Sequence, residues 1–233
     1  MIEIRVEGPG KNALGTKLIA DLSKQIDEAN GQPILFTGAG DAFSAGLNLK
    51  EVGGLEPDGM DAFLDRLETF FRKVWLYPGP TAAAVNGHAI AGGCILAMCC
   101  DIAIATNNPK ARIGLNEVAI GLRFPPGLLN FVRTMIAPHH LNEVVLGAGL
   151  HAPESAVRLG LVHSTSADPA GDATSALERL AKHPTEAYGA AKRDLRQGIM
   201  EATPAEKKAF REDVVPFWTS PELKAMIRSL LGG

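Results

Sequence analysis

The chain has 233 residues, of which 46% are hydrophobic, enough for one large domain or for a domain with an appendage. Its net charge of −3 provides no basic surface for nucleic acid, so no nucleic-acid partner is expected. No apolar run reaches the roughly 20 residues of a membrane span, and the N-terminus lacks a signal pattern. We therefore expect a cytoplasmic protein with no membrane partner.

The first third of the chain alternates between strand and helix patterns. Ile2, Ile4 and Val6 alternate with charged residues, which predicts a half-buried strand. Apolar residues at helical spacing follow over residues 14–29, and residues 33–37 form the next predicted strand. A loop over residues 53–59 precedes an amphipathic helix over 63–75, whose aromatic face we interpret as core.

The most informative stretch lies between residues 81 and 101. Residues 81–85 predict a buried strand, and a polar turn then leads to a helix over 92–100 that opens with two glycines. The first N–H groups of a helix have no internal partner, so an oxyanion can bind at Gly92. The alternative is that Gly92 and Gly93 only permit close packing. This helix contains three cysteines, Cys94, Cys99 and Cys100. We interpret them as buried, reduced thiols, so no metal site is expected.

A second turn, over residues 41–51, also runs from a strand into a helix start. Taken with the first, it gives the chain a family resemblance that no single motif would establish. The motifs, in order, are Lys11-Asn-Ala-Leu14, Phe43-Ser-Ala-Gly46, Ala84-Val-Asn-Gly87, Ala91-Gly-Gly-Cys94, Cys100-Asp-Ile102 and Ile113-Gly-Leu-Asn-Glu-Val118. In this order and spacing they resemble the crotonase superfamily, also called the enoyl-CoA hydratase/isomerase family.

The resemblance implies an α/β fold: a crotonase-like spiral of strand-strand-helix repeats with a C-terminal helical region. Residues 1–170 would form the spiral core with an acyl-CoA site. Residues 171–233 would form a helical region that covers the pocket and builds a homotrimer or a hexamer. No cofactor is implied, because coenzyme A enters as part of the acyl-CoA thioester substrate.

The resemblance also implies the site residues. The backbone N–H groups of Ala45 and Gly92 would hold the thioester oxygen as catalytic donors, and Glu117 would be the catalytic acid/base. The substrate-binding residues around them would be Ser44, Gly46, Leu47, Ile95 and Asn116.

Glu117 also stands out from its own neighbourhood, because nearly all residues from 113 to 121 are apolar or glycine. A carboxylate buried there would be costly without a task, and burial would raise its pKa toward neutrality. The alternative from the residues alone is an exposed loop glutamate.

One departure from the family decides the expected reaction. Hydratases carry a second glutamate where this chain has Ile95, so a single carboxylate favours moving a double bond over adding water. The motifs look most like Δ3,Δ2-enoyl-CoA isomerases. Hydratase activity, another enolate reaction on an acyl thioester, and a catalytically weak acyl-CoA-binding homologue stay open.

The last third of the chain predicts mainly helices. A helix over 128–136 is followed by a short helix and strand over 152–162, and then by a linker at 167–171. Three helices are expected after it, over 172–182, 185–201 and from 204 onward, with a break near Pro216 and Pro221. Phe217 and Trp218 are candidates for a pocket, an interface or ordinary core.

Overall fold

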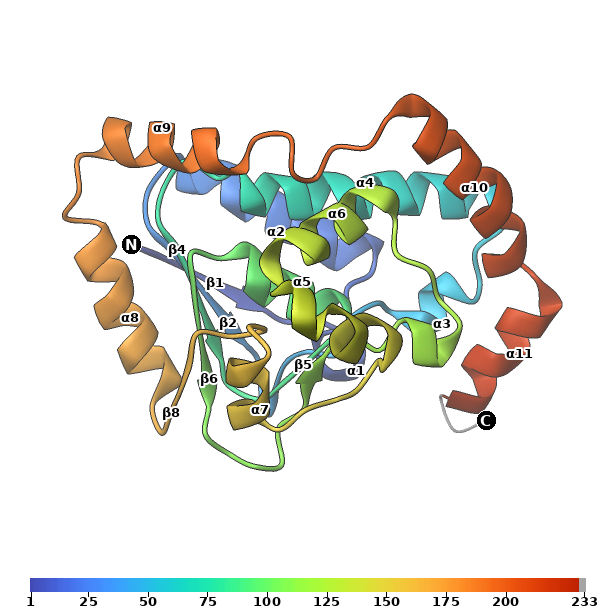
Figure 1. The fold of residues 1–233 in the computed structure, drawn as a ribbon, viewed down its shortest axis with the longest axis horizontal. Coiled ribbons are helices and arrows are strands. Elements are labelled where there is room, and N and C mark those ends of the chain that lie inside the picture. The colour runs from blue at the N-terminus through green and yellow to red at the C-terminus, as the bar shows by residue number, and fades with distance from the viewer. Residues whose placement is uncertain (231–233) are drawn as a thin grey trace.

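The computed structural model describes residues 1–230 as a spiral of parallel strands covered by helices (Figure 1). The strands are β1 (Ile2–Val6), β2 (Ile34–Gly38), β3 (Ala42–Ser44), β4 (Thr81–Val85), β5 (His88–Ile90), β6 (Ile102–Thr106), β7 (Ile113–Gly114) and β8 (Ser164–Ser166). The helices of the first part are α1 (Pro9–Asn12), α2 (Thr16–Ala29), α3 (Leu49–Val52), α4 (Pro57–Trp75) and α5 (Gly92–Cys99). Those that follow are α6 (Pro126–Met135), α7 (Pro153–Arg158), α8 (Pro169–Leu180), α9 (Thr185–Arg196), α10 (Pro204–Trp218) and α11 (Pro221–Leu230), with short 3-10 and π turns at Val118–Ile120, Pro138–His140 and Asn142–Leu146.

Successive turns of the spiral add one strand to each of two parallel sheets. The larger sheet has the order β1-β2-β4-β6-β8, and the smaller has the order β3-β5-β7. The chain therefore moves from β2 to β3, from β4 to β5 and from β6 to β7, changing sheet each time. This is the crotonase-like α/β spiral that the motifs implied.

Small side chains let the centre of the larger sheet be covered on both faces. Strand β4 is buried along its whole length, and Ala82 and Ala83 pair with Ile102 and Ala103 of β6. A parallel sheet is stable when both of its faces are covered. Here α8 covers one face, where Ala173 and Leu177 pack with Leu35, Ala82, Ala84 and Ile104.

The smaller sheet did not stand out in the sequence. Its strands have only two or three residues, too few for an alternating pattern to be recognised, and they lie inside segments that predict turns. They are held by neighbours instead: the N–H of Ala91, just after β5, donates to the Gly114 carbonyl of β7 at 2.8 Å.

The C-terminal helices differ from the sequence expectation in two places. The predicted linker at 167–171 is wrong, because α8 begins at Pro169 and Asp168 caps it by accepting from the Gly171 N–H at 3.0 Å. The helix expected over 185–201 is shorter, because α9 ends at Arg196. The expected break near Pro216 and Pro221 is confirmed: α10 continues through Pro216 to Trp218, and the break lies between Trp218 and Pro221. Residues 231–233, the end of the predicted C-terminal region, lie outside the described residues.

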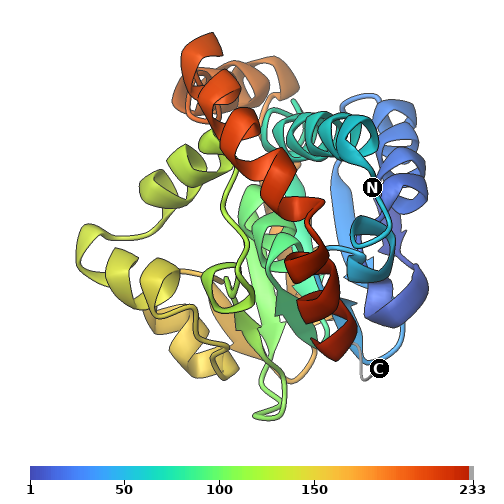
Figure 2. The ribbon, with the colours of Figure 1, turned by 90° about the vertical axis from the view of Figure 1, so that its right-hand side faces the viewer.

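Helices α9, α10 and α11 follow one another along the outside of the core, and α10 and α11 cross one face of it (Figures 1 and 2). A buried ionic cluster anchors α9. The carboxylate of Asp101 accepts from the Lys192 ammonium at 2.9 Å and pairs with the Arg196 guanidinium at 2.7 Å. It also accepts from the Tyr188 hydroxyl at 2.8 Å and from the Thr81 N–H at 2.7 Å.

Candidate active site

Three chain segments meet where the strands of the smaller sheet end. Residues 45–48 follow β3, residues 91–92 follow β5 and residues 115–117 follow β7. The strands are parallel, so their carboxyl ends lie at one edge of the sheet, which is where open α/β sheets bind ligands. The spiral thus brings together motifs that are more than 20 residues apart in the sequence.

The first segment offers a free backbone amide, but not the one that the sequence predicted. The N–H of Ala45 donates to the Lys11 carbonyl at 2.9 Å, so Ala45 as an oxyanion donor is a wrong prediction. The backbone of Leu14 forms hydrogen bonds with the two residues that flank Leu47. Its carbonyl accepts from the Asn48 N–H at 3.0 Å, and its N–H donates to the Gly46 carbonyl at 2.6 Å. Amides alternate in direction along an extended chain, so the N–H of Leu47 points away from Leu14. It has no acceptor within residues 1–230.

The second free amide belongs to Gly92, the first residue of α5. Its N–H has no acceptor in the helix, because the first intrahelical acceptor, the Ala91 carbonyl, is taken by Ile95 at 3.0 Å. The two segments touch: a Cβ added to Gly46 would lie 3.3 Å from the Gly92 nitrogen. Gly93 permits close packing, which was the alternative role inferred from the sequence, because a Cβ there would come within 2.3 Å of the Ser44 carbonyl oxygen.

Two predicted substrate-binding residues support the turn and do not line the cavity. Ser44 is fully buried, and its hydroxyl donates to the Asn12 carbonyl at 2.8 Å and accepts from the Gly46 N–H at 3.2 Å. Gly46 has a φ of +86°, which favours glycine, and a Cβ there would lie 2.7 Å from the Ile90 carbonyl oxygen. The substrate-binding role predicted for Ser44 and Gly46 is therefore wrong, because their polar groups are used within the fold.

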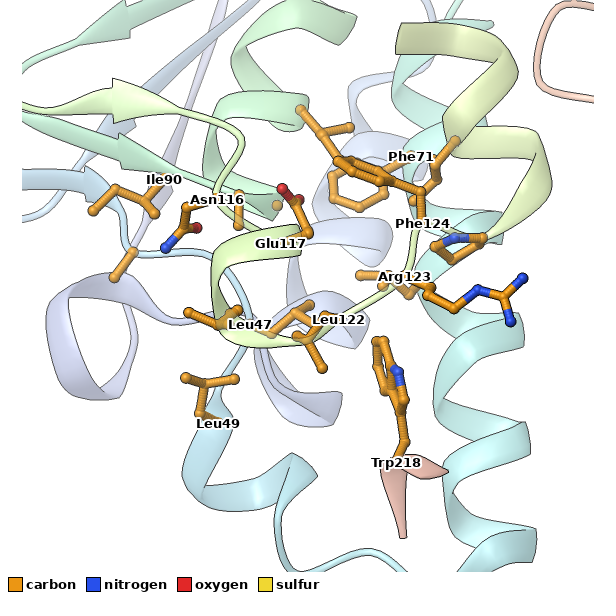
Figure 3. Close-up of a pocket in the computed structure, with 18 residues that line it drawn as sticks. Leu47, Leu49, Phe71, Ile90, Asn116, Glu117, Leu122, Arg123, Phe124 and Trp218 are labelled. Carbon is orange, nitrogen blue, oxygen red and sulfur yellow. The ribbon is translucent and has the colours of Figure 1, made fainter. Parts of the chain in front are cut away.

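A cavity of about 230 Å³ opens beside the amides of Leu47 and Gly92 (Figure 3). Ala45, Leu47, Ile95, Asn116 and Glu117 line it, as the sequence analysis expected for contacts with substrate. Most other lining residues are apolar: Leu49, Leu67, Phe71, Ile90, Ala91, Ile120, Leu122, Phe124, Pro125, Leu128 and Trp218, with Arg123 at one side. The cavity therefore suits a hydrocarbon chain.

Glu117 is a buried carboxylate inside this apolar lining, and the alternative of an exposed loop glutamate is wrong. The residue is only 7% exposed, and its Oε2 atom has no hydrogen-bond donor within the described part of the chain. Burial raises the pKa of Glu117 to about 7. A carboxyl group with that pKa can both take and return a proton near neutral pH.

Comparison with known proteins identifies the family. A sequence model described as Enoyl-CoA hydratase/isomerase matches residues 1–222. The chain belongs to the enoyl-CoA hydratase/isomerase family. The resemblance found in the motifs is thereby confirmed.

Its relatives in this family include proteins named hydratases and proteins named isomerases. The chain is 31% identical to the crotonyl-CoA hydratase of Syntrophomonas wolfei, in a match that covers 65% of this chain and 60% of that protein. It is also 31% identical to the mitochondrial enoyl-CoA delta isomerase 1 of Rattus norvegicus, over 68% of this chain and 57% of the relative. The matched segments thus span less than two thirds of either relative.

Solved structures of the family share the fold. The human mitochondrial delta3-delta2-enoyl-CoA isomerase superposes with a TM-score of 0.90 at 22% identity, covering 98% of this chain and 92% of that one. The enoyl-CoA hydratase of Bacillus halodurans superposes with a TM-score of 0.84 at 22% identity, covering 97% and 95%. The fold therefore does not distinguish the two activities.

This family member has one carboxylate in its cavity. Glu117 is the only acidic residue that lines it within residues 1–230, and Ile95, where hydratases were expected to keep a second glutamate, is a buried wall residue. The described residues contain no cluster of three or more potential metal ligands.

None of the helices in residues 1–230 combines the length and the apolar character that a membrane span requires.

The sequence reasoning missed much of the apolar wall. Leu67 and Phe71 belong to the α4 stripe that we interpreted as core, and the structure shows that the same stripe also faces the cavity. Leu122 and Phe124 lie in a loop without periodicity, so no sequence signal marked them. The sequence left the roles of Phe217 and Trp218 open. Trp218 lines the cavity, whereas Phe217 is 42% exposed and does not line it.

The raised pKa predicts that Glu117 destabilises the fold at neutral and alkaline pH. The unfolded value is near 4.5 and the folded value about 7, so the folded state binds the proton more tightly. The penalty is absent below pH 4.5, grows as the pH rises to about 7 and is complete above it, at about 3 kcal/mol. Glu117→Gln should therefore raise the free energy of unfolding at pH 8 by up to about 3 kcal/mol, and by much less at pH 5.

Urea denaturation at the two pH values measures this difference. Glu178→Gln, at an exposed position on α8, is the matched control and should show no such pH-dependent gain. An equal gain at both pH values would show that the Glu117 carboxyl group is not held in its neutral form by burial.

Proposed function

We propose that this protein is a Δ3,Δ2-enoyl-CoA isomerase that moves the double bond of a 3-enoyl-CoA to the 2-position. The observation that carries the proposal is a single buried carboxylate, Glu117, in an apolar cavity beside two free backbone amides, those of Leu47 and Gly92. Coenzyme A would enter only as part of the substrate.

The proposed reaction needs one base and one oxyanion site. The Glu117 carboxylate removes a proton from C2 of the acyl group, and the electrons form a dienolate whose negative charge lies on the thioester oxygen. The N–H groups of Leu47 and Gly92 donate to that oxygen, and each such donor is commonly worth about 2.7–4 kcal/mol of barrier. Glu117 then returns the proton to C4, which leaves the double bond between C2 and C3.

Hydration of a 2-enoyl-CoA is the second candidate, and Ile95 argues against it. Adding water requires a nucleophilic water that is oriented and deprotonated and a proton that is delivered to C2. General acid/base assistance is worth about 10²–10⁴ in rate, so losing one of two carboxylates should leave a poor hydratase. Hydration stays an alternative because some relatives of this chain are named hydratases. A binding protein with weak catalysis is the third candidate.

An assay of two substrates separates these candidates. Turnover of 3-hexenoyl-CoA to the conjugated 2-enoyl product should exceed hydration of crotonyl-CoA by at least about 100-fold in kcat/KM, the lower end of what a lost acid/base group costs. Both reactions can be followed by the absorbance of the conjugated thioester, which appears in the first and disappears in the second. Equal or faster hydration would contradict the isomerase proposal. Binding of both substrates without turnover would favour the weak binding homologue.

A further inference from the structure

The cavity has an open end and a closed end. Leu47, Ile90 and Asn116, beside the free amides, are partly exposed. Trp218, by contrast, is 2% exposed. In Figure 3, Trp218 lies on the opposite side of the cavity from Ile90 and Asn116, with Glu117 and Leu122 between them. An acyl chain whose thioester sits at the amides would therefore point its far end toward Trp218.

Trp218 closes this end as a buried part of the core. It is the last residue of α10, is 2% exposed and is among the largest fully buried side chains of the protein. Val214 and Phe210 are buried one and two turns before it on the same face of α10, which packs on α4. The indole N–H has no acceptor within residues 1–230, so packing alone holds the ring.

Among residues 1–230, no charged group stands at the closed end to receive a polar tail. Arg123 lines the cavity, but its guanidinium is directed to the outside, 3.4 Å from the Asp213 carboxylate and 5.9 Å from the centre of the Phe210 ring. A chain end that reaches Trp218 would therefore meet hydrocarbon and the indole ring.

We infer that Trp218 sets the upper limit of acyl chain length and restricts the protein to acyl-CoA thioesters of medium length. An engineered apolar cavity of about 150 Å³ holds benzene, which has six carbons. At the same filling, the cavity of about 230 Å³ holds about nine carbons. The inference rests on the proposed function for the placement of the thioester, and it adds the residue that selects the substrate.

Binding of saturated acyl-CoA esters tests this without requiring turnover. Octanoyl-CoA fits the cavity, whereas dodecanoyl-CoA exceeds it by about three carbons at the filling assumed above. Calorimetric Kd values should show that the wild-type protein binds dodecanoyl-CoA no more tightly than octanoyl-CoA. Each newly buried methylene is worth about fourfold in affinity, so Trp218→Ala should shift the ratio of the two Kd values toward dodecanoyl-CoA by at least about tenfold.

Two further variants keep the test decisive. Trp218→Phe, which removes less volume, should fold even if the alanine variant does not, and should shift the ratio in the same direction by a smaller factor. Phe217→Ala changes the neighbouring side chain of α10 outside the cavity and should leave the ratio unchanged.

The outcomes separate the two levels of the argument. If the wild-type protein binds octanoyl-CoA but neither Trp218 variant changes the ratio, the role of Trp218 is wrong and the proposed function survives. A wild-type preference for dodecanoyl-CoA, or an equal shift in Phe217→Ala, would also overturn the role of Trp218. If the wild-type protein binds neither ester, both the inference and the proposed function fail.

Discussion

Glu117→Gln should lower kcat for 3-hexenoyl-CoA by about 10²–10⁴-fold, because the amide cannot remove the C2 proton. The substitution keeps the size of a side chain that is 7% exposed, so the cavity keeps its shape. The Kd of octanoyl-CoA should therefore change by less than about threefold, a difference below 1 kcal/mol. Loss of catalysis without loss of binding would identify Glu117 as the acid/base.

The pH dependence supplies an independent readout of the same role. The wild-type kcat/KM should rise about tenfold per pH unit up to the Glu117 pKa of about 7 and then level off, because only the ionised carboxylate is a base. The residual activity of Glu117→Gln should lack this inflection. Glu178→Gln, on the exposed side of α8, is the matched control and should keep both the rate and the profile. Turnover by Glu117→Gln within tenfold of wild type would exclude this glutamate as the base.

The second large effect is on stability and concerns the ionic cluster that anchors α9. Asp101→Asn should lower the free energy of unfolding by about 3–5 kcal/mol, because it leaves the cations of Lys192 and Arg196 buried without their counter-charge. The Asp101 side chain is 9% exposed, so water cannot replace the carboxylate. The deficit should shrink toward pH 9, since burial lowers the pKa of Lys192 to about 8 and a neutral amine needs no counter-charge.

A surface ion pair provides the control for Asp101→Asn. Asp21 pairs with Lys17 one turn earlier on α2, at 2.7 Å, with both side chains largely exposed. Asp21→Asn should cost no more than about 0.5 kcal/mol, because exposed pairs at this spacing contribute little. Urea denaturation of the three proteins at pH 7 measures both values. A cost for Asp101→Asn as small as that of Asp21→Asn would show that the buried cluster does not stabilise the attachment of α9.

Three strands of the main sheet, β1, β2 and β4, and the long helices could be predicted from local patterns. Strand β4 and helix α5 were found with boundaries within one residue, because a strand buried on both faces and an apolar helix opened by glycines leave clear signals. The C-terminal boundaries were predicted less well. The break expected near Pro216 and Pro221 lies after Trp218, because packing of the Phe210, Val214 and Trp218 face keeps α10 intact through Pro216.

The sequence by itself determined the family, the glycine-opened helix and the isolated carboxylate at Glu117, because these depend on residue type and spacing along the chain. The tertiary structure decided which amides are free. Nothing in the local sequence distinguishes the N–H group of Ala45 from that of Leu47. The Lys11 carbonyl, more than 30 residues away in the sequence, accepts from the Ala45 N–H, and the Leu47 N–H stays free. It also decided the burial of Glu117 and the closure of the cavity by Trp218. Both result from contacts between distant segments, which local patterns do not record.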